Sequence, residues 1–365
     1  MLYKLGFVIE QTLGQVTHTQ NFQQWVAKDA AVEATWFLIS YEKPHGLAAA
    51  PLIRRNWTVR ASLQARAQVR DALRTQRLDA LFFHTPVTAL FAHRLMRAIP
   101  SVVSMDATPR NIDHIGEPYD HKPSSSQRIE SIKNALTKRT FDRARKLVVW
   151  NEWGKRSLVD DYGSAPGKVS VIPPGIDLTK WNFPRSAPDG PQPVRLLFVG
   201  GDFRRKGGET LLKAFRRHLA QRCELDIVTR ERVDLEGVPN ARVHHGLGPN
   251  APELRALYAR ADVFVFPTLA DVLPLAIMEA MASGLPVITT DVGAIVEQID
   301  DGVTGLLIPP NDVDALSAAT RRLVDDPVLR FQMGSAARRV ADERFNSSTN
   351  YARLLDVCKA CAEGR

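Results

Sequence analysis

Short apolar runs alternate along the whole chain with longer segments in which apolar residues recur at helical spacing. The runs contain few polar positions, which is typical of strands that helices cover on both faces of a parallel sheet. We therefore predict an α/β fold in which crossover helices join parallel strands. The predicted strands lie at residues 5–9, 35–40, 80–85, 101–105, 146–150, 194–200, 225–229, 261–267, 285–290 and 305–310.

A proline-rich stretch without periodicity, residues 173–193, interrupts this alternation, and another apolar run follows it. Such a break is typical of a linker, and 365 residues suffice for two domains of ordinary size. We predict two Rossmann-like, doubly wound domains that face a cleft and bind ligands beyond the carboxyl ends of their strands. The expected boundaries are 1–177 for the N-terminal domain, 178–193 for the linker, 194–345 for the C-terminal domain, and 346–365 for a last helix that packs back toward the N-terminal domain.

The net charge of +8 is unevenly distributed. Residues 1–177 hold 24 Lys and Arg residues against 16 Asp and Glu residues, whereas the remainder is balanced. A solvated helix face and contact with an anionic membrane or an anionic acceptor both fit this excess, and no nucleic-acid-binding module is recognised. The bases gather in an arginine stripe at helical spacing, Arg66, Arg70, Arg74 and Arg77, and in a cluster of Lys138, Arg139, Arg143, Arg145 and Lys146.

Cysteines and paired acids do not indicate a metal site. Three cysteines are too few for a disulfide framework and fit a reducing compartment. Cys358 and Cys361 form a lone CxxC without further ligands, and Asp312 and Asp314 stand at a predicted helix start, where acids cap the helix. The sequence opens on a strand and has no apolar run of membrane-spanning length, so we expect a cytoplasmic protein without a resident metal.

The stretch DVLPLAIMEAMASGLPVITTD, residues 271–291, places one carboxylate, Glu279, in an otherwise apolar helix. Pro274 suits the first turn of that helix, and Gly284 suits its left-handed end. An unpaired carboxylate among apolar neighbours is costly, so Glu279 requires partners. Two kinds of partner are open, a cation of the protein and the diol of a ligand such as a ribose.

The start of the same helix is a candidate anion site. Its free N–H groups and the helix dipole favour a phosphate near Pro274 and Leu275. Asp271 stands in the loop just before this point, where it would touch whatever the phosphate carries.

A second candidate anion site is FVGGDFRRKGGETLLKAF, residues 198–215. Gly200 and Gly201 end a strand, and a helix begins near Glu209. Glycines let the backbone approach an anion, and the bases of the loop neutralise it. The spacings of a P-loop and of GxGxxG are both absent, so a solvated basic turn fits the same residues. The bases are Arg204, Arg205 and Lys206.

The two stretches together resemble glycosyltransferase family 4, retaining transferases of GT-B fold. That family carries E-x7-E followed by A-M-A-x-G-x-P-V-I, and here Asp271 and Glu279 precede AMASGLPVI. The resemblance covers the second half closely, and the first half resembles one branch of the family in EQTLGQVTH (10–18) and VVSMDATP (102–109). Further landmarks are PPGID (173–177), RKGG (205–208), ADVFVFPT (261–268) and DGVTGLLIPPND (301–312).

The resemblance implies a nucleotide-diphosphate sugar of the UDP or GDP type as donor and assigns roles by position. Glu279 would hold the ribose hydroxyls of the donor, and Asp271 would meet its sugar. Lys206, with Arg205, would bind the diphosphate, so Lys206 and Asp271 would be catalytic. The implied donor-binding residues are Gly14, Gly201, Arg204, Arg205, Lys206, Asp271, Pro274, Leu275 and Glu279.

Two departures from the family pattern concern the donor. Asp271 is one methylene shorter than the glutamate of the family. Gly201 stands where many members have an arginine, so Arg204 or Arg205 is expected to supply that charge.

A third departure concerns the acceptor. The run 101–105 ends at Asp106, where many members have a histidine near the reacting carbon. His84, at the end of the run 80–85, is the nearest alternative. We keep Asp106 and His84 as candidate catalytic groups on the acceptor side.

The resulting hypothesis is a retaining, metal-independent glycosyltransferase that moves a sugar to a hydroxyl of a glycan, lipid or small-molecule acceptor. Fixed positive groups would stabilise the leaving diphosphate, and its phosphate would take the proton of the acceptor. The expected partners are a nucleotide sugar, a glycan or lipid-linked acceptor and an anionic membrane surface on the inner face, not nucleic acid. A GT-B nucleotide-sugar epimerase, a degenerate nucleotide-sugar-binding protein, and an adaptor that uses the basic half are the alternatives.

Overall fold

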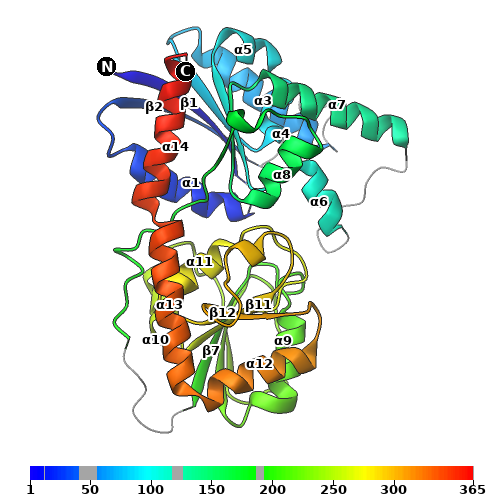
Figure 1. The fold of residues 1–365 in the computed structure, drawn as a ribbon, viewed down its shortest axis with the longest axis vertical. Helices are drawn as coiled ribbons and strands as arrows, with labels where there is room; N and C mark the ends of the chain where they lie inside the picture. The colour runs from blue at the N-terminus through cyan, green and yellow to red at the C-terminus, as the bar shows by residue number, and fades with distance from the viewer. Residues whose placement is uncertain (12, 41–55, 117–125, 186–192, 365) are drawn as a thin grey trace. The chain divides into compact units, whose positions relative to one another are not determined.

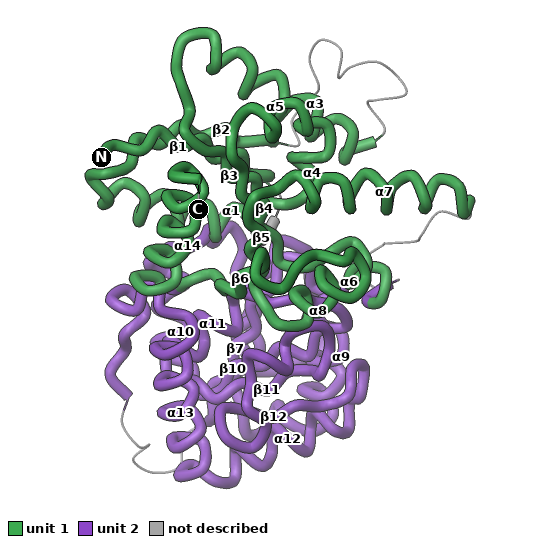
Figure 2. Tube along the Cα trace, turned by 45° about the horizontal axis from the view of Figure 1, so that its top comes forward, with its two compact units in different colours: residues 1–114, 122–175, 347–365 green, residues 115–121, 176–346 purple. Residues whose placement is uncertain are grey.

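The computed structural model describes residues 1–11, 13–40, 56–116, 126–185 and 193–364. The chain forms two compact units (Figure 1; Figure 2). Unit 1 comprises residues 1–114, 122–175 and 347–365, and unit 2 comprises residues 115–121 and 176–346. Each unit is built on a six-stranded parallel sheet, as the apolar runs predicted.

The sheet of unit 1 has the strand order β2-β1-β3-β4-β5-β6. Its elements are β1 (Tyr3–Glu10), α1 (Leu13–Val26), β2 (Val32–Ile39), α3 (Trp57–Ala72), β3 (Ala80–His84), α4 (Pro86–Ala89), α5 (His93–Ala98), β4 (Ser101–Met105), α6 (Pro109–Ile115), α7 (Gln127–Arg143), β5 (Lys146–Val149), α8 (Glu152–Asp160), the 3₁₀ helix η3 (Pro166–Lys168), β6 (Val169–Val171) and α14 (Ser347–Ala362).

This sheet separates two apolar cores, because successive side chains of a strand point to opposite faces. Phe83 lies in the core formed with α3, α4, α5, α7 and α8, whereas Phe82 lies in the core formed with α1 and α14. Figure 1 shows α1 and α14 on one side of the sheet and α3, α4 and α8 on the other. Helices on both faces explain why the strands are apolar throughout.

The last helix, α14, completes the second of these cores. Tyr351, Leu354 and Leu355 are buried there together with Cys358 and Cys361. Both cysteines are free thiols, and burial raises the pKa of Cys361 to about 11. Within the described ranges, no group of three His, Cys, Asp or Glu side chains could hold a metal ion. The lone CxxC therefore contributes apolar packing on a helix face.

The sheet of unit 2 has the strand order β12-β11-β10-β7-β8-β9. This is the order of the dinucleotide-binding Rossmann fold, in which the direction of strand addition reverses at one point, here between β7 and β10. The elements are β7 (Val194–Val199), α9 (Gly208–Ala214), the π-helical turn η4 (Phe215–Leu219), β8 (Cys223–Val228), β9 (Ala241–His244), α10 (Pro252–Arg260), β10 (Val263–Phe266), α11 (Leu275–Ala282), β11 (Val287–Thr290), the 3₁₀ helix η5 (Ile295–Glu297), β12 (Gly305–Ile308), α12 (Val313–Asp325) and α13 (Pro327–Phe345).

Part of the segment predicted as a linker packs on unit 2. Trp181 is buried, and its ring meets Tyr258 edge to face with the centroids 5.0 Å apart. The guanidinium of Arg185 donates to the carbonyls of Ser283 at 2.8 Å and Tyr258 at 2.6 Å. Residues 178–185 therefore belong to the packed structure of unit 2, whereas 186–192 lie outside the described residues.

Every predicted run overlaps a strand, and the two strands without a predicted run are β6 and β9. Each lies at the outer edge of its sheet and is short. Most of their side chains are only partly buried, so their sequences carry a weaker apolar signal than those of the central strands. No helix of the described residues is long and apolar enough to cross a membrane.

Candidate functional site

The loops after β7 and β10 meet at the carboxyl edge of the sheet in unit 2, where the strand order reverses. Gly207 has a φ of +79°, and a Cβ on it would overlap the carbonyl oxygen of Pro267. The N–H of Leu269 donates to the carbonyl of Arg205 at 2.8 Å. Glycine is therefore required where the two loops cross. In folds of this kind, ligands bind at the carboxyl edge beside such a reversal.

A lysine and an aspartate join these loops. The ammonium of Lys206 donates to the carboxylate of Asp271 and lies 5.0 Å from the ring centroid of Phe266. Burial lowers the pKa of Lys206, and the charge of Asp271 opposes that shift. An ammonium offers three donors and uses one on Asp271. A positioned cation with further donors thus lies at the point of strand reversal.

The neighbouring Arg205 holds this arrangement in place. Its Nε donates to Asp202 at 2.9 Å, and its terminal nitrogen donates to the carbonyl of Ala270 at 2.7 Å. The same terminal nitrogen lies 3.8 Å from Asp271. Arg205 therefore ties the loop after β7 to the loop after β10, whereas Arg204 is exposed to solvent.

Helix α11 begins directly after these loops. Pro274 is its N-cap, with extended backbone, and not a residue of its first turn as the sequence predicted. A proline loses no helical hydrogen bond at either place. Leu275 and Ala276 are half-buried, whereas Ile277 and the residues that follow are buried, so the accessible end is the N-terminus. Gly284, with a φ of +73°, ends the helix as predicted.

Glu279 lies on α11 and is 5% exposed. Its Oε2 accepts a hydrogen bond from the hydroxyl of Tyr258 at 3.1 Å. No cation among the described residues pairs with it, and its other oxygen accepts no hydrogen bond from them. Burial raises the pKa of Glu279 to about 7. The alternative of a structural ion pair is therefore not realised in the described structure, and one oxygen is left for a ligand hydroxyl.

Two family models match the chain, one in each half. The model of glycosyltransferase family 4 matches residues 14–180, and the model of glycosyl transferases group 1 matches residues 193–326. The chain belongs to glycosyltransferase family 4. The two matches cover the greater part of both units.

The D-inositol 3-phosphate glycosyltransferase of Arthrobacter sp. strain FB24 is 32% identical over 219 residues, 54% of this chain and 52% of that protein. The chain thus spans about half the length of this family member.

Solved structures share the fold. The sucrose-phosphate synthase of Thermosynechococcus elongatus has a TM-score of 0.78 at 18% identity and covers 100% of both chains. HepE of Anabaena in complex with UDP-glucose has a TM-score of 0.69 at 14% identity, covering 98% of this chain and 99% of that chain. At these identities the likeness shows the GT-B fold alone.

Arg230 is a basic residue near this edge that the sequence reasoning missed. It follows β8, the neighbour of β7, and its guanidinium Nε and a terminal nitrogen lie 2.8 Å from the position that a Cβ on Gly201 would take. Arg230 is exposed, and no described carboxylate pairs with it. The missing side chain at Gly201 therefore leaves space that Arg230 occupies. The available signal was a base directly after an apolar run, in VTR at residues 228–230.

The acceptor-side candidates lie at the carboxyl edge of the sheet in unit 1. Nε2 of His84 lies 2.6 Å from the side-chain oxygen of Gln15, and its ring stacks on Trp150. His84 is fully buried, and burial followed by the charge of His18 holds its pKa well below its usual range. The structure thus places His84 as a neutral, buried residue, and its catalytic role stays a prediction.

Two further site residues of unit 1 also stay predictions. Asp106 is half-buried directly after β4, and its carboxylate accepts from the N–H of Ala107 at 2.9 Å. Asn151 donates to the carbonyl of Asp106 at 2.7 Å and so orders this loop. Gly14 lies in the first turn of α1.

A polar pair at the strand reversal of unit 1 was also missed. Glu10 ends β1, is buried, and accepts from the hydroxyl of Thr85 at 2.6 Å and from the indole of Trp57 at 2.9 Å. Thr85 has a φ of +62°, which a β-branched residue rarely adopts. Strain of this kind gathers at functional sites. An acid at the end of the first strand was the available signal.

The paired acids lie at the start of α12, as predicted: Asp312 is its N-cap and Asp314 is in its first turn. Oδ1 of Asp312 accepts from the N–H groups of Asp314 at 3.0 Å and Ala315 at 2.8 Å. This carboxylate is a helix cap.

The raised pKa of Glu279 predicts a pH-dependent stability. The folded-state pKa of about 7 lies above the ordinary value of 4.5 for a glutamate, so the stabilising contribution is present below pH 4.5 and is lost as the pH rises through 7. Glu279→Gln stays neutral, so its free energy of unfolding minus that of the wild type should rise by about 3 kcal/mol across this window. Urea unfolding at several pH values measures the difference. Parallel curves for the two proteins would contradict a buried carboxyl that ionises near neutrality.

Proposed function

We propose that the protein is a retaining glycosyltransferase that moves a sugar from a nucleotide-diphosphate sugar to an acceptor hydroxyl. The observation that carries the proposal is the distance on unit 2 between the buried carboxyl of Glu279 and the start of α11. Four residues of helix span about 6 Å, which suits a ribose at one end and a diphosphate at the other. The free oxygen of Glu279 would accept from the ribose, and the N–H groups at Leu275 would face the diphosphate.

The donor in this proposal is of the UDP or GDP type. The Anabaena HepE structures hold UDP and UDP-glucose, which supports a uridine diphosphate donor. A ligand that binds only the folded protein raises the melting temperature. A panel of nucleotide sugars screened in this way would identify the donor, and the absence of any shift would contradict the proposal.

In the proposed reaction, negative charge grows on the leaving diphosphate while the anomeric carbon acquires positive character. Lys206 would turn its remaining donors to the phosphate oxygens, and the α11 N-terminus would add its dipole. Asp271 would orient the ammonium and face the donor sugar. The leaving phosphate would accept the proton of the incoming hydroxyl, so that the bond to the sugar forms on the face from which the diphosphate departs.

The acceptor contacts are assigned to unit 1, with Asp106 and His84 as the candidates near the reacting carbon. The acceptor would be a glycan, a lipid or a small molecule with a free hydroxyl. The Arthrobacter relative, a D-inositol 3-phosphate glycosyltransferase, supports a small phosphorylated polyol as the first acceptor to test. Altered sugar formed from donor alone would indicate an epimerase instead, and donor binding without any turnover would indicate a degenerate binding protein.

Replacement of Lys206 by alanine tests the role of the cation. We expect turnover to fall by about 100-fold to 1,000-fold, because charge that develops only in the transition state loses its partner. Steady-state kinetics with the donor found by the screen measure it. Lys213→Ala, which removes an exposed lysine of α9 outside the donor-binding set, should leave turnover near the wild-type value. Wild-type turnover in Lys206→Ala would remove this lysine from the mechanism.

Arg230 is proposed as the second cation for the diphosphate, in place of a side chain at Gly201. Arg230→Gly should weaken the binding of nucleoside diphosphate by about 10-fold, as loss of one charged hydrogen bond does. The double variant Gly201→Arg/Arg230→Gly returns a guanidinium to the same space and should restore affinity. Arg232→Gly, an exposed arginine on the same loop, is the control. A double variant as weak as the single one would contradict the shared position.

A further inference from the structure

A basic pocket of about 430 Å³ lies in unit 1, on the helical layer formed by α3, α5 and α7. Arg66 reaches it from α3, Arg94 and Arg97 from α5, and Arg139 from α7. His93 also lines it, and no acid does. The pocket thus gathers side chains from helices far apart in the sequence around one concave, positive surface.

Among the described residues, the arginines of the pocket lack a carboxylate partner, whereas some arginines outside it have one. Just beyond α3, Arg74 pairs with Asp71 and Arg77 with Asp79, each at 3.5 Å. Because α3 ends at Ala72, the predicted four-arginine stripe on one helix is wrong: of the four, Arg66 and Arg70 lie on α3, and Arg74 and Arg77 lie beyond it. In the described parts of the chain, none of the four pocket arginines forms an ion pair.

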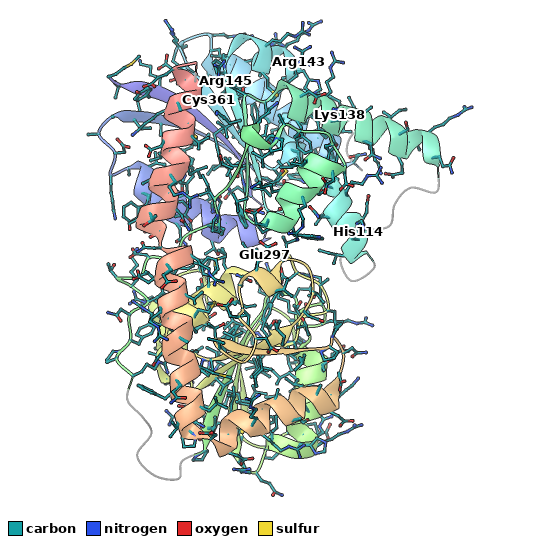
Figure 3. All side chains as sticks on the ribbon, in the orientation of Figure 1. His114, Lys138, Arg143, Arg145, Glu297 and Cys361 are labelled. Atoms are coloured by element: carbon teal, nitrogen blue, oxygen red, sulfur yellow. The ribbon has the colours of Figure 1, made fainter. Side chains whose placement is uncertain are left out.

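The positive charges around the pocket affect the pKa of His93. Burial lowers the pKa of this histidine, and the charges of Arg139, Arg143 and Arg97 lower it further. Figure 3 shows Arg143 and Lys138 on α7. Of the predicted basic cluster, Lys138, Arg139 and Arg143 lie on this helix, whereas Arg145 follows it and Lys146 begins β5. Positive groups held together without counter-charges repel one another, and an anion among them would relieve that repulsion.

Hydrogen bonds join the helices that carry the pocket residues. Nε2 of His93 lies 2.9 Å from the hydroxyl of Thr140, which itself donates to the carbonyl of Leu136 at 3.0 Å. The N–H of Phe91 donates to the hydroxyl of Ser62 on α3 at 2.7 Å. These bonds tie α5 to α7 and the turn before α5 to α3. The side chains of Phe91 and Leu136 add apolar surface beside the arginines.

We propose that this pocket binds a phosphate group carried by an organic molecule, either a soluble phosphate ester or the headgroup of a membrane phospholipid. The guanidinium fork matches phosphate oxygens in pairs, which distinguishes arginine from a simple point charge. The apolar residues beside it suit the carbon that carries the phosphate. The site lies in unit 1 and uses no residue assigned to the donor, so it goes beyond the proposed transferase activity.

The test compares two double variants of equal charge. Arg66→Gln/Arg139→Gln removes one pocket arginine from α3 and one from α7. Arg70→Gln/Arg128→Gln removes one exposed arginine from each of the same helices, outside the pocket lining. Calorimetry with inorganic phosphate and glycerol 3-phosphate probes the soluble source. Sedimentation with phosphatidylcholine vesicles, with and without phosphatidylglycerol, probes the lipid source.

We expect the wild type to bind at least one phosphate carrier, the pocket variant to bind it about 100-fold more weakly, and the control to stay within about 3-fold of the wild type. The carrier that binds identifies the source. Arg94→Gln/Arg97→Gln, on exposed positions of α5, should reproduce the loss if the first variant folds poorly. Failure of every carrier to bind would overturn the proposal. An equal loss in the pocket and control variants would also overturn it, because it would indicate diffuse attraction to a basic face.

Discussion

The candidate donor site depends on the position at which the parallel sheet of unit 2 reverses its strand order. Because β7 and β10 are neighbours there, the loops that leave them must cross at the same edge. The crossing is close enough that Gly207 meets the backbone at Pro267. It also places Lys206 against Asp271, two residues that are 65 positions apart in the chain. A cation, an acid and the start of α11 are thereby held on backbone that has little freedom to move.

The buried carboxyl of Glu279 is the group at this edge on which the proposed ribose binding depends. The helix around it is apolar, and its hydrogen bond from Tyr258 satisfies one oxygen only. Burial raises the pKa of Glu279 to about 7, so the carboxylate form is held at a cost that a ligand with two hydroxyl donors would offset. A donor that brings a ribose to Glu279 and a diphosphate to the start of α11 would satisfy both groups.

Local features could be predicted from the sequence, whereas contacts between neighbouring strands could not. The stop at Gly284, the cap at Asp312 and the apolar central strands follow from short-range rules, and the structure confirms them. The placement of Arg230 over Gly201 depends on β8 lying beside β7, and the bond from Thr85 to Glu10 depends on β3 lying beside β1. Both require the strand order, which apolar runs do not encode. The basic pocket likewise requires the packing of three helices.

The most direct test of the account is whether Glu279 holds the ribose of the donor. Calorimetry would compare uridine or guanosine diphosphate, whichever binds, with its 2′,3′-dideoxy analogue, in the wild type and in Glu279→Ala. We expect the wild type to prefer the natural nucleotide by about 100-fold, as two hydrogen bonds to a carboxylate imply, and the variant to bind both ligands weakly and equally. A variant that keeps the wild-type affinity and preference would contradict the central claim.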